Sequence, residues 1–531
     1  MNPPAAHAQH LGLGSWPSRR AALTPDAVAL SFEGEDITYA QLSARVDAQA
    51  AWMQQEAGIG QGDRVAYFGA NHPALLETLF AAGRIGAVAV LVNARLAREE
   101  VLHLLNDSGA RLLFVDPALW PGLARPGQDE APALEAVIPV EQAPQEITAG
   151  RGVTVLDLAM ARGRGGELVG GLQVPGVGLE DPCLLMYTSG TTGRPKGAVL
   201  TNGNLFFNDV NVLIESDIRP DEVMLCVAPL FHIAGLNGLV LPVLLKGGRV
   251  VVHRAFHPVR ALEAIVREGV TSLFGVPAML DAMASAPGFG ETDLSSLRTL
   301  IVGGAPVPER LLRQWAERGV QIQQGYGLTE TAPAVLKLAA EDATQHLGSA
   351  GKPQFLVDVR LVGLDGEDVG VGETGEILTR GPNVFHEYWG MPEASQAAFQ
   401  EGWFRTGDVA VRDADGYYTL RDRAKDMYIS GGENVYPSEV ESALLDVPGV
   451  AEAAVIGVPD PRWGEVGRAY IVPASGSELS QDDVLEALQG RLARYKQPRS
   501  VVVLEEMPRT STGKLQKQAL RARTEDGDPV H

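Results

Sequence analysis

The amino-acid sequence predicts an α/β protein. We expect a large N-terminal domain of layered α/β sheets, a small β-rich subdomain and a small α+β C-terminal domain. Three observations predict this class. In the first half, short apolar runs that end at Gly, Asn, Asp or Pro alternate with amphipathic segments, as in parallel α/β layers. After about Gly351 the apolar residues alternate singly, which is typical of half-exposed antiparallel strands. The last part of the chain has the size and pattern of a separate domain.

The first half begins with a helix signal and continues with repeated strand signals. Thr38 and Gln41 form a capping box, and Gly58 can close the helix that follows it. Residues 117–182 are rich in Pro, Gly and Ala with little periodicity, so we interpret them as a long surface excursion. Six apolar runs are predicted to be buried parallel strands, at 64–70, 87–94, 111–116, 223–229, 272–277 and 299–306.

The second half predicts a hairpin and then a compact α+β unit. Asp415 and Gly416 form a hairpin turn signal between two alternating segments. We expect an N-terminal domain over 1–422 and a C-terminal domain over 423–531. The C-terminal domain is predicted to contain a helix at 438–445, strands at 451–458 and 468–474, a helix at 482–492 and a strand at 500–507.

Composition excludes several classes of protein. The chain of 531 residues has a formal net charge of −22, which argues against nucleic acid as a partner but leaves room for a local basic site. Cys183 and Cys226 lie in apolar runs, which indicates a reducing compartment without a disulfide framework. The longest apolar stretch, Ala234 to Leu245, is too short to span a bilayer, and we see no signal peptide. We therefore expect a cytoplasmic protein with no membrane span.

The stretch "YTSGTTGRPKGAV", Tyr187 to Val199, has the chemistry of a phosphate-binding loop. Its glycines allow backbone N–H groups to approach an anion, and its Ser and Thr hydroxyls add hydrogen-bond donors. Lys196 supplies a mobile positive charge suited to phosphate. Pro195 precedes this lysine and Gly197 follows it, so the loop does not fit the Walker A pattern. A helix is expected to begin near Thr201.

Four further motifs accompany this loop in a specific order: "QGYGLTET" at 324–331, "GWFRTGDVA" at 402–410, "DRAKDMYISGGENVYPSEVE" at 422–441 and "PRTSTGKLQK" at 508–517. Together with the loop, they resemble the adenylate-forming acyl-CoA synthetases, which share a fold with peptide-synthetase adenylation domains and firefly-type luciferases. The resemblance covers about Ala21 to Leu520 and is closest to bacterial long-chain fatty acid or hydroxycinnamate (feruloyl) CoA ligases.

The resemblance implies an acid–thiol ligase that uses ATP, Mg²⁺ and CoA. In the family's reaction a carboxylate attacks the α-phosphate of ATP, which gives acyl-AMP and pyrophosphate, and a thiol then displaces AMP. Because the first step gathers several negative charges, catalysis rests on positioning and electrostatic stabilisation. The implied partners are a small carboxylic acid, ATP and CoA; a carrier protein as acceptor and a homodimeric state stay open.

The family's functional residues carry over onto matching positions of this sequence. Glu330 is implied as the Mg²⁺ ligand and Lys425 as the hinge about which the small domain rotates. The implied catalytic residues are Lys514, Glu330, Thr188, Lys196 and His232. The implied nucleotide- and cofactor-binding residues are Thr188, Ser189, Gly190, Thr191, Thr192, Gly193, Lys196, Gly304, Ala305, Pro306, Gln324, Gly325, Tyr326, Gly327, Thr329, Asp408, Arg423, Gly431, Gly432 and Lys514.

The acid itself is predicted from the residues that the resemblance places around the acyl group. These are His232, Ala234, Gly235, Gly238, Gly303 and Gly325. They are small and include no Arg or Lys, so a dicarboxylate would bury an unpaired charge. We therefore expect a hydrophobic monocarboxylic acid, with a medium- or long-chain fatty acid first. A hydroxycinnamate or other aryl acid is the alternative, because flat rings also fit glycine-lined slots, and a free-standing acyl-AMP ligase that loads a carrier protein is another.

Overall fold

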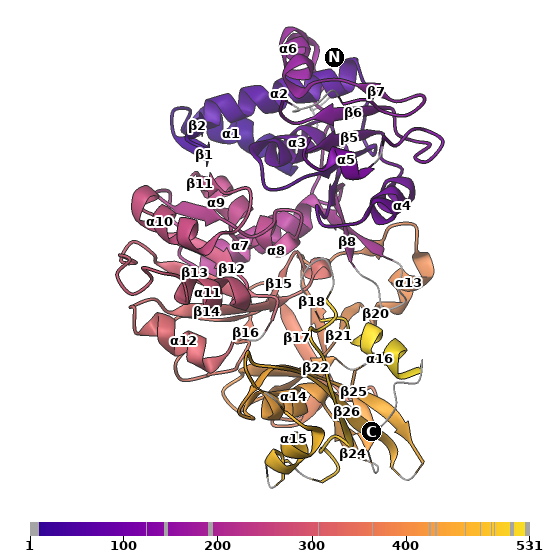
Figure 1. Cartoon of the computed structure of the whole chain (residues 1–531). Coiled ribbons are helices and arrows are strands. Elements are labelled where there is room, and N and C mark those ends of the chain that lie inside the picture. The colour runs from indigo at the N-terminus through magenta and orange to yellow at the C-terminus, as the bar shows by residue number, and fades with distance from the viewer. Residues whose placement is uncertain are drawn as a thin grey trace. The chain divides into compact units, whose positions relative to one another are not determined.

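The computed structural model describes residues 10–123, 125–142, 147–188, 195–305, 307–363, 365–423, 426–430, 433–461, 463–477, 479–489, 491–492, 494–509 and 515–525 (Figure 1). The chain forms two compact units. The first comprises Met1–Val359 and Thr379–Phe404, and the second comprises Arg360–Leu378 and Arg405–His531. The expected domain boundary between residues 422 and 423 stays a prediction.

The first unit contains an eight-stranded sheet in the order β19-β9-β8-β4-β3-β5-β6-β7. Three strands predicted from apolar runs, β3, β4 and β5, lie side by side and are parallel, as expected. The strands of this sheet are β3 (Arg64–Phe68), β4 (Val88–Val92), β5 (Leu112–Val115), β6 (Ala136–Pro139), β7 (Thr154–Val155), β8 (Pro182–Thr188), β9 (Lys196–Thr201) and β19 (Glu387–Tyr388).

A nine-stranded sheet in the same unit has the order β16-β15-β14-β13-β12-β10-β11-β1-β2. The other three predicted strands, β10, β12 and β13, are parallel neighbours here. The strands are β1 (Val28–Phe32), β2 (Glu35–Thr38), β10 (Val223–Cys226), β11 (Arg249–Val252), β12 (Ser272–Gly275), β13 (Thr299–Gly303), β14 (Ile322–Gly327), β15 (Ala334–Leu338) and β16 (Lys352–Pro353).

The helices of the first unit begin and end at recognisable caps. Thr38 forms the predicted capping box with Gln41 at the start of α2, and Thr201 forms a second one at the start of α7. The helices are α1 (Trp16–Leu23), α2 (Tyr39–Gln55), α3 (Pro73–Arg84), α4 (Arg98–Ser108), α5 (Trp120–Leu123), α6 (Leu158–Leu168), α7 (Asn202–Glu215), α8 (Ile233–Gly235), α9 (Leu241–Lys246), α10 (Pro258–Glu268), α11 (Pro277–Ala284), α12 (Glu309–Ala316) and α13 (Pro392–Ala397). Short helical segments of other types are η1 (Leu13–Ser15), η2 (Val169–Gly171), the π-helical η3 (Leu236–Val240) and η4 (Thr329–Thr331).

The main core of the first unit contains buried residues of both large sheets. Along β3, Val65 and Tyr67 belong to this shared core, whereas Ala66 and Phe68 belong to a separate core on the other face. Side chains alternate between the two faces of a strand, so β3 contributes to two cores. The sheets are therefore buried on both faces, as the unbroken apolar runs predict.

The expectation that residues 117–182 form only a surface excursion is wrong. This segment contributes β6 and β7 to the eight-stranded sheet and forms helix α6. A Cβ atom added to Gly165 would lie 1.9 Å from the carbonyl oxygen of Ala48 in α2. Glycine therefore allows α6 to approach α2 closely, and the same glycine content weakens the helix signal in the sequence.

A five-stranded sheet, in which β20 and β22 both pair antiparallel with β21, provides the expected β-rich part. Its order is β17-β18-β21-β20, and β22 pairs with β21. Gly416, at the predicted hairpin turn between β21 and β22, has a φ of 85°. The strands are β17 (Asp358–Val362), β18 (Thr374–Arg380), β20 (Phe399–Gln400), β21 (Trp403–Arg412) and β22 (Tyr418–Arg423).

The last part of the chain forms an α+β fold, as predicted. Its sheet has the order β24-β23-β26-β25, with β27 paired to β26. The predicted helix at 482–492 is shorter in the structure. The elements are β23 (Tyr428–Ser430), β24 (Glu433–Val435), α14 (Pro437–Leu445), β25 (Val450–Asp460), β26 (Gly464–Pro473), α15 (Gln481–Ala487), β27 (Ser500–Val503) and α16 (Lys517–Glu525).

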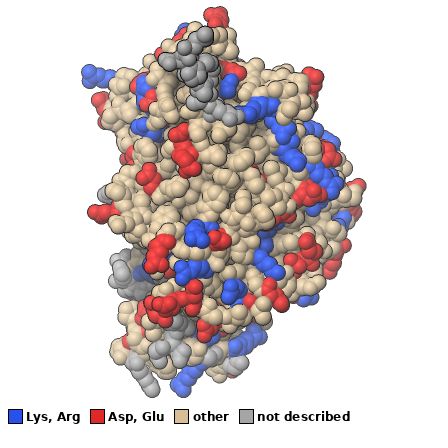
Figure 2. Space-filling view, turned by 180° about the vertical axis from the view of Figure 1, so that it is seen from behind, with Lys and Arg blue, Asp and Glu red and all other residues tan. Residues whose placement is uncertain are grey.

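Charged side chains of both signs are interspersed among uncharged areas on the face drawn in Figure 2. The sequence segment Ala234–Leu245 folds into α8, η3 and α9, which are too short to cross a bilayer. Among the residues that the structure describes, no helix combines the length and apolar character of a membrane span.

Candidate active site

The predicted phosphate loop connects the antiparallel strands β8 and β9. Thr188 ends β8 and Lys196 begins β9, and the two are directly opposed partners in the ladder. The Thr188 hydroxyl lies 3.4 Å from the carbonyl oxygen of Lys196. The hairpin therefore brings the first and last predicted phosphate-binding residues together at one end of the sheet. The intervening candidates Ser189, Gly190, Thr191, Thr192 and Gly193 lie outside the described residues.

Glu330, the predicted Mg²⁺ ligand, lies in η4 and is only 7% exposed. Its carbonyl oxygen accepts a 2.8 Å hydrogen bond from the backbone N–H of Phe385. Its carboxylate Oε1 accepts a 2.9 Å hydrogen bond from the hydroxyl of Tyr388. Burial, together with the adjacent Glu330 carboxylate, raises the pKa of Tyr388 well above its usual value, so the phenol stays protonated and able to donate.

Tyr388 also contacts the predicted phosphate lysine. The Nζ atom of Lys196 lies 5.1 Å from the centroid of the Tyr388 ring, within the range of a cation–π contact. Lys196 and Glu330, which the sequence assigns to one site, thus contact the ring and the hydroxyl of the same tyrosine. The sequence does not identify Tyr388 as a site residue. Its strand has only two residues, too few to show periodicity, and Tyr388 lies outside the five motifs described above.

Buried asparagines hold the turn that follows Glu330. The side-chain Nδ2 of Asn237, in η3, donates a 2.6 Å hydrogen bond to the carbonyl oxygen of Ala332. The side-chain oxygen of Asn208, in α7, accepts a 3.2 Å hydrogen bond from the backbone N–H of Ala334. These bonds satisfy backbone groups that would otherwise be buried without partners, and so they fix the path of the turn.

The predicted nucleotide residues near 304 and 325 lie where two parallel strands end. Gly303 in β13 is the ladder partner of Gly325 in β14. Gly304 has a φ of 84°, which favours glycine, and Pro306 lies outside the described residues. The other predicted nucleotide-binding residues of this group lie just after β13, in β14 or in η4. They are Ala305, Gln324, Tyr326, Gly327 and Thr329. The carboxyl ends of parallel strands are where α/β sheets usually bind ligands.

Gln324 shows an incomplete hydrogen-bond pattern at this strand end. Its side-chain Nε2 is buried and has no hydrogen-bond partner among the described residues. A buried donor without an acceptor costs about 1–3 kcal/mol, so a ligand or water that supplies an acceptor would stabilise the site. The position fits the predicted nucleotide site.

Two of the predicted acyl-pocket glycines, Gly238 and Gly303, pack against Phe274, which the sequence does not single out. A Cβ atom added to Gly238 would lie 3.4 Å from the Phe274 ring, and one added to Gly303 would lie 3.6 Å from it. A Cβ atom on Gly235 would lie 2.2 Å from the carbonyl oxygen of Pro229. Gly235 is therefore small because the backbone approaches it closely. Gly238 faces the Phe274 ring, and Gly303 faces both that ring and the carbonyl oxygen of Gly325, which a Cβ atom would approach to 3.1 Å.

His232 and Ala234 lie at the start of the same pocket segment. His232 is the residue before α8 and is half-buried, and its ring makes an edge contact with Phe231 at 4.8 Å between centroids. Its backbone carbonyl accepts a hydrogen bond from the N–H of Leu236. Ala234 lies in α8 and is partly buried against the main core. The assignment of both residues to the acyl pocket stays a prediction.

The remaining candidates belong to the second unit. Asp408 lies in β21, is 9% exposed, and is the ladder partner of Arg423 in β22. Its backbone N–H donates a 3.1 Å hydrogen bond to the hydroxyl of Thr406. Lys425, Gly431, Gly432 and Lys514 lie outside the described residues.

Comparison with known proteins identifies the family to which this chain belongs. The family described as AMP-binding enzyme matches residues 18–389, and its C-terminal domain matches residues 439–514. The chain belongs to the AMP-binding enzyme family. It is an AMP-forming acid–CoA ligase with the α/β fold of that family.

Two curated relatives and one solved structure of this AMP-binding enzyme are similar over nearly the whole chain. A feruloyl-CoA synthase from Amycolatopsis sp. is 50% identical over 515 residues, which cover 96% of this chain and 99% of the relative. The long-chain-fatty-acid–CoA ligase FadD13 of Mycobacterium tuberculosis is 37% identical and covers 95% and 96% of the two chains. The o-succinylbenzoate coenzyme A synthetase of Bacillus subtilis, solved in complex with ATP and a magnesium ion, is 33% identical with a TM-score of 0.81 and covers 96% of this chain and 99% of that chain.

The residues of this AMP-binding enzyme fit a magnesium ion that shares its coordination with phosphate. Mg²⁺ is usually held by one or two carboxylates together with substrate phosphates and water. Within the described ranges, no group of three or more His, Cys, Asp or Glu side chains is arranged to hold a metal. A single buried carboxylate such as Glu330, with its orientation held by Tyr388, is consistent with the shared arrangement.

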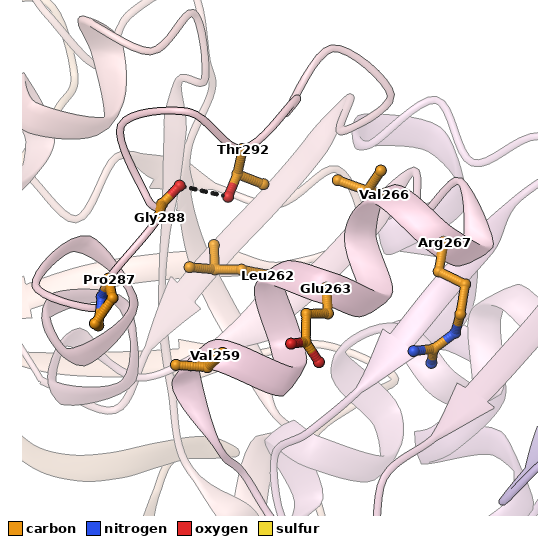
Figure 3. A pocket seen from close by; sticks show the side chains of 8 residues that line it. All are labelled: Val259, Leu262, Glu263, Val266, Arg267, Pro287, Gly288 and Thr292. Atoms are coloured by element: carbon orange, nitrogen blue, oxygen red, sulfur yellow. Dashed lines mark hydrogen bonds between the residues drawn. The ribbon is translucent and has the colours of Figure 1, made fainter.

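A separate hollow of about 550 Å³ lies beside α10 (Figure 3). Val259, Leu262 and Val266 of the helix line it, and the hydroxyl of Thr292 donates a 2.8 Å hydrogen bond to the Gly288 carbonyl oxygen at its edge. It shares no residue with the predicted ATP or acyl site of the AMP-binding enzyme, so we assign it no part in the reaction.

Proposed function

We propose that this AMP-binding enzyme activates a hydroxycinnamate-type aryl acid, such as ferulate, and transfers the acyl group to CoA. The observation that carries this proposal is the 50% identity to a feruloyl-CoA synthase over 96% of the chain. The fatty acid expected first from the sequence is the second candidate. It is supported by the lower identity, 37%, to a long-chain-fatty-acid–CoA ligase.

The residues of the predicted acyl pocket favour a flat substrate. Gly303 and Gly325 are paired across neighbouring strands, so their backbones present a surface without side chains. A Cβ atom on Gly325 would find its nearest neighbour only at 3.8 Å, in the side chain of Ile301. The Phe274 ring lies against Gly303 and Gly238. A glycine surface beside an aromatic ring suits a planar aryl group, which gains from offset or edge contacts with aromatic side chains.

In the first half-reaction, the acid's carboxylate oxygen attacks the α-phosphate of ATP and pyrophosphate leaves. Thr188 and Lys196 would hold the β- and γ-phosphates of the leaving group. Glu330 would hold Mg²⁺, which when bound supplies positive charge to the phosphates. Lys514 would lie between the carboxylate and the α-phosphate, where an ammonium group contributes on the order of a few kcal/mol to transition-state stabilisation.

Other residues would position AMP and the thiol. The Tyr326 ring would stack on adenine, and Asp408 would accept hydrogen bonds from the ribose hydroxyls. In the second half-reaction the thiol sulfur of CoA attacks the acyl carbon and AMP leaves. A rotation about Lys425 would present Gly431 and Gly432 to the thiol, so that one site serves both steps.

The test is acid-dependent pyrophosphate release with ATP and Mg²⁺, measured with and without CoA and followed by mass spectrometry of the acyl-CoA. The panel contains ferulate, cinnamate, benzoate, octanoate, palmitate and malonate. We expect kcat/KM for ferulate to exceed that for octanoate and palmitate by at least about tenfold, the discrimination that about 1.4 kcal/mol of differential binding provides. The Lys514→Ala variant is the control for background hydrolysis.

The other outcomes identify the competing functions. A preference for palmitate or octanoate would replace the aryl acid with a fatty acid. Pyrophosphate release with ferulate but no feruloyl-CoA would indicate a carrier protein as acceptor. A Lys514→Ala variant with full acid-dependent release would remove Lys514 from the catalytic role.

A further inference from the structure

Tyr388 contacts two residues of the proposed phosphate and magnesium site through different parts of its side chain. Its hydroxyl donates to the Glu330 carboxylate at 2.9 Å, and its ring lies 5.1 Å from the Lys196 ammonium. We propose that Tyr388 is a positioning residue that orients Glu330 and Lys196 toward Mg²⁺-bound ATP. This inference rests on the proposed roles of Glu330 and Lys196, but it does not depend on which acid the enzyme activates.

The hydroxyl constrains the carboxylate. Glu330 has three rotatable side-chain bonds, and a carboxylate offers about four lone-pair positions. A hydrogen bond from Tyr388 to Oε1 therefore selects one orientation and still leaves acceptor capacity for a metal. Partners that orient a metal-binding carboxylate typically change metal affinity by 10- to 100-fold when they are removed.

The ring constrains the lysine. Lys196 carries a compact charge on a flexible stem, so its ammonium can occupy many positions around the phosphate loop. A contact with the face of an aromatic ring within about 6 Å favours positions over that ring. The distance of 5.1 Å to the Tyr388 ring places the ammonium in this range. Tyr388 therefore restricts the positions of both charged groups, the Glu330 carboxylate through its hydroxyl and the Lys196 ammonium through its ring.

The backbone around Tyr388 is itself fixed to the strand that carries Lys196. Tyr388 lies in β19 and is the ladder partner of Ala198 in β9. The next N–H, of Trp389, donates a 2.7 Å hydrogen bond to the carbonyl oxygen of Gly197. The Phe385 ring also makes an edge contact with the Tyr388 ring, with 4.8 Å between the ring centroids. The side chain is 9% exposed, so these contacts hold it in one place.

The carbonyl of Glu330 is held by the same segment. Phe385 N–H donates to it at 2.8 Å, only three residues before Tyr388. Both the backbone and the carboxylate of Glu330 are thus attached to residues 385–388. Removing only the Tyr388 hydroxyl should remove this one constraint on the carboxylate while the backbone bond and the ring packing remain. This makes Tyr388→Phe a specific test.

The experiment measures ATP binding to the full-length enzyme by titration calorimetry, without any acid or CoA. Each variant is titrated once with ATP and excess Mg²⁺ and once with ATP and EDTA. We expect Tyr388→Phe to weaken Mg²⁺–ATP binding by about tenfold and to change ATP binding in EDTA by less than about twofold. Tyr388→Leu, which also removes the ring beside Lys196, should weaken ATP binding in EDTA as well.

A matched control separates positioning from stability. The Tyr39 hydroxyl is also buried and donates a 2.6 Å hydrogen bond to the carbonyl oxygen of Gly248. Tyr39→Phe should lower the thermal midpoint without changing the ratio of the two ATP affinities. In a Glu330→Gln background, which lacks the carboxylate, adding Tyr388→Phe should produce no further change in that ratio.

Three results would overturn the proposal. Tyr388→Phe with unchanged Mg²⁺–ATP affinity would show that the hydroxyl does not position Glu330. Equal losses with and without Mg²⁺, matched by Tyr39→Phe, would show a purely structural role. If the wild-type enzyme itself bound ATP equally well in Mg²⁺ and in EDTA, the proposed role of Glu330 would fail, and the role of Tyr388 with it.

Discussion

The side-chain Nδ2 of Asn383 donates a 2.7 Å hydrogen bond to the carbonyl oxygen of Thr331, the residue after Glu330. The same nitrogen donates a second 2.7 Å hydrogen bond to the carbonyl oxygen of Ala334. Asn383 and Thr331 are both fully buried, so water cannot replace either bond without opening the core. This amide therefore fixes both ends of the turn that follows the predicted magnesium ligand.

Asn383→Ala should destabilise the enzyme by about 1–3 kcal/mol or more, because it removes the donor shared by two buried carbonyl oxygens. Urea denaturation of the full chain, followed by tryptophan fluorescence, measures the change. Asn106→Ala is the control, since Asn106 makes a comparable 2.7 Å bond to the carbonyl of Glu130 in an exposed setting. Equal changes in the two variants would contradict the structural role of Asn383.

Gly327→Ala should destabilise the fold strongly. An added Cβ would lie 1.7 Å from the carbonyl oxygen of Pro333, a backbone atom that cannot move aside cheaply. We expect a loss of about 3 kcal/mol or more, measured as a lower thermal midpoint or as failure to recover folded protein. Gly60→Ala, where an added Cβ would meet nothing within 4 Å, should leave the midpoint nearly unchanged. A normal midpoint for Gly327→Ala would contradict the close approach of the turn to β14.

Lys337 should make stability depend on pH in the alkaline range. Burial lowers the pKa of this 8% exposed lysine to about 8, and the nearby Glu215 and Glu341 only partly oppose that shift. Its Nζ donates to the Glu215 carbonyl oxygen at 2.8 Å. Between pH 8 and about 10.5 the unfolded chain binds more protons at this position than the folded chain. The contribution of Lys337 to the free energy of unfolding therefore increases as the pH rises.

Lys337→Met should remove this gain. Relative to the variant, the wild type should become more stable by about 1–3 kcal/mol between pH 7 and 10, as judged by denaturation at each pH. Lys352 faces Lys337 across the β15–β16 ladder but is exposed, so Lys352→Met serves as the control and should show no such difference. A constant difference between wild type and Lys337→Met across this range would refute the prediction.

Asp408→Ala should weaken ATP binding by about 10- to 100-fold, because hydrogen bonds to a charged group contribute about 1.5–3 kcal/mol. Asp413 provides the control within the same hairpin. Its carboxylate accepts a 2.8 Å hydrogen bond from the N–H of Tyr417 and so supports the turn rather than the proposed ribose site. In calorimetric titrations with ATP, Asp413→Ala should bind ATP as the wild type does, whereas Asp408→Ala should bind it more weakly. Unchanged affinity in Asp408→Ala would count against the ribose assignment.

Much of the fold could be predicted because its signals are local. All six apolar runs of the first half form parallel strands, and the capping box at Thr38 begins a helix as expected. The sequence does not indicate that these strands divide between two sheets, since the pairing of β5 with β6 or of β10 with β11 depends on contacts between distant segments. Helix α6 was missed because its glycines, which permit close packing on α2, lower its helix propensity.

The family, the predicted phosphate loop between β8 and β9, and the candidate residues Thr188, Lys196 and Glu330 could be predicted from the sequence alone, because these residues lie in short contiguous motifs. The residues that orient them become visible only in the folded chain. Tyr388 reaches Glu330 across 58 residues of sequence, and Asn383 reaches Thr331 across 52. Periodicity indicates which face of an element is buried, but the partner of a buried polar group is set by how distant segments pack, and no local pattern encodes that choice.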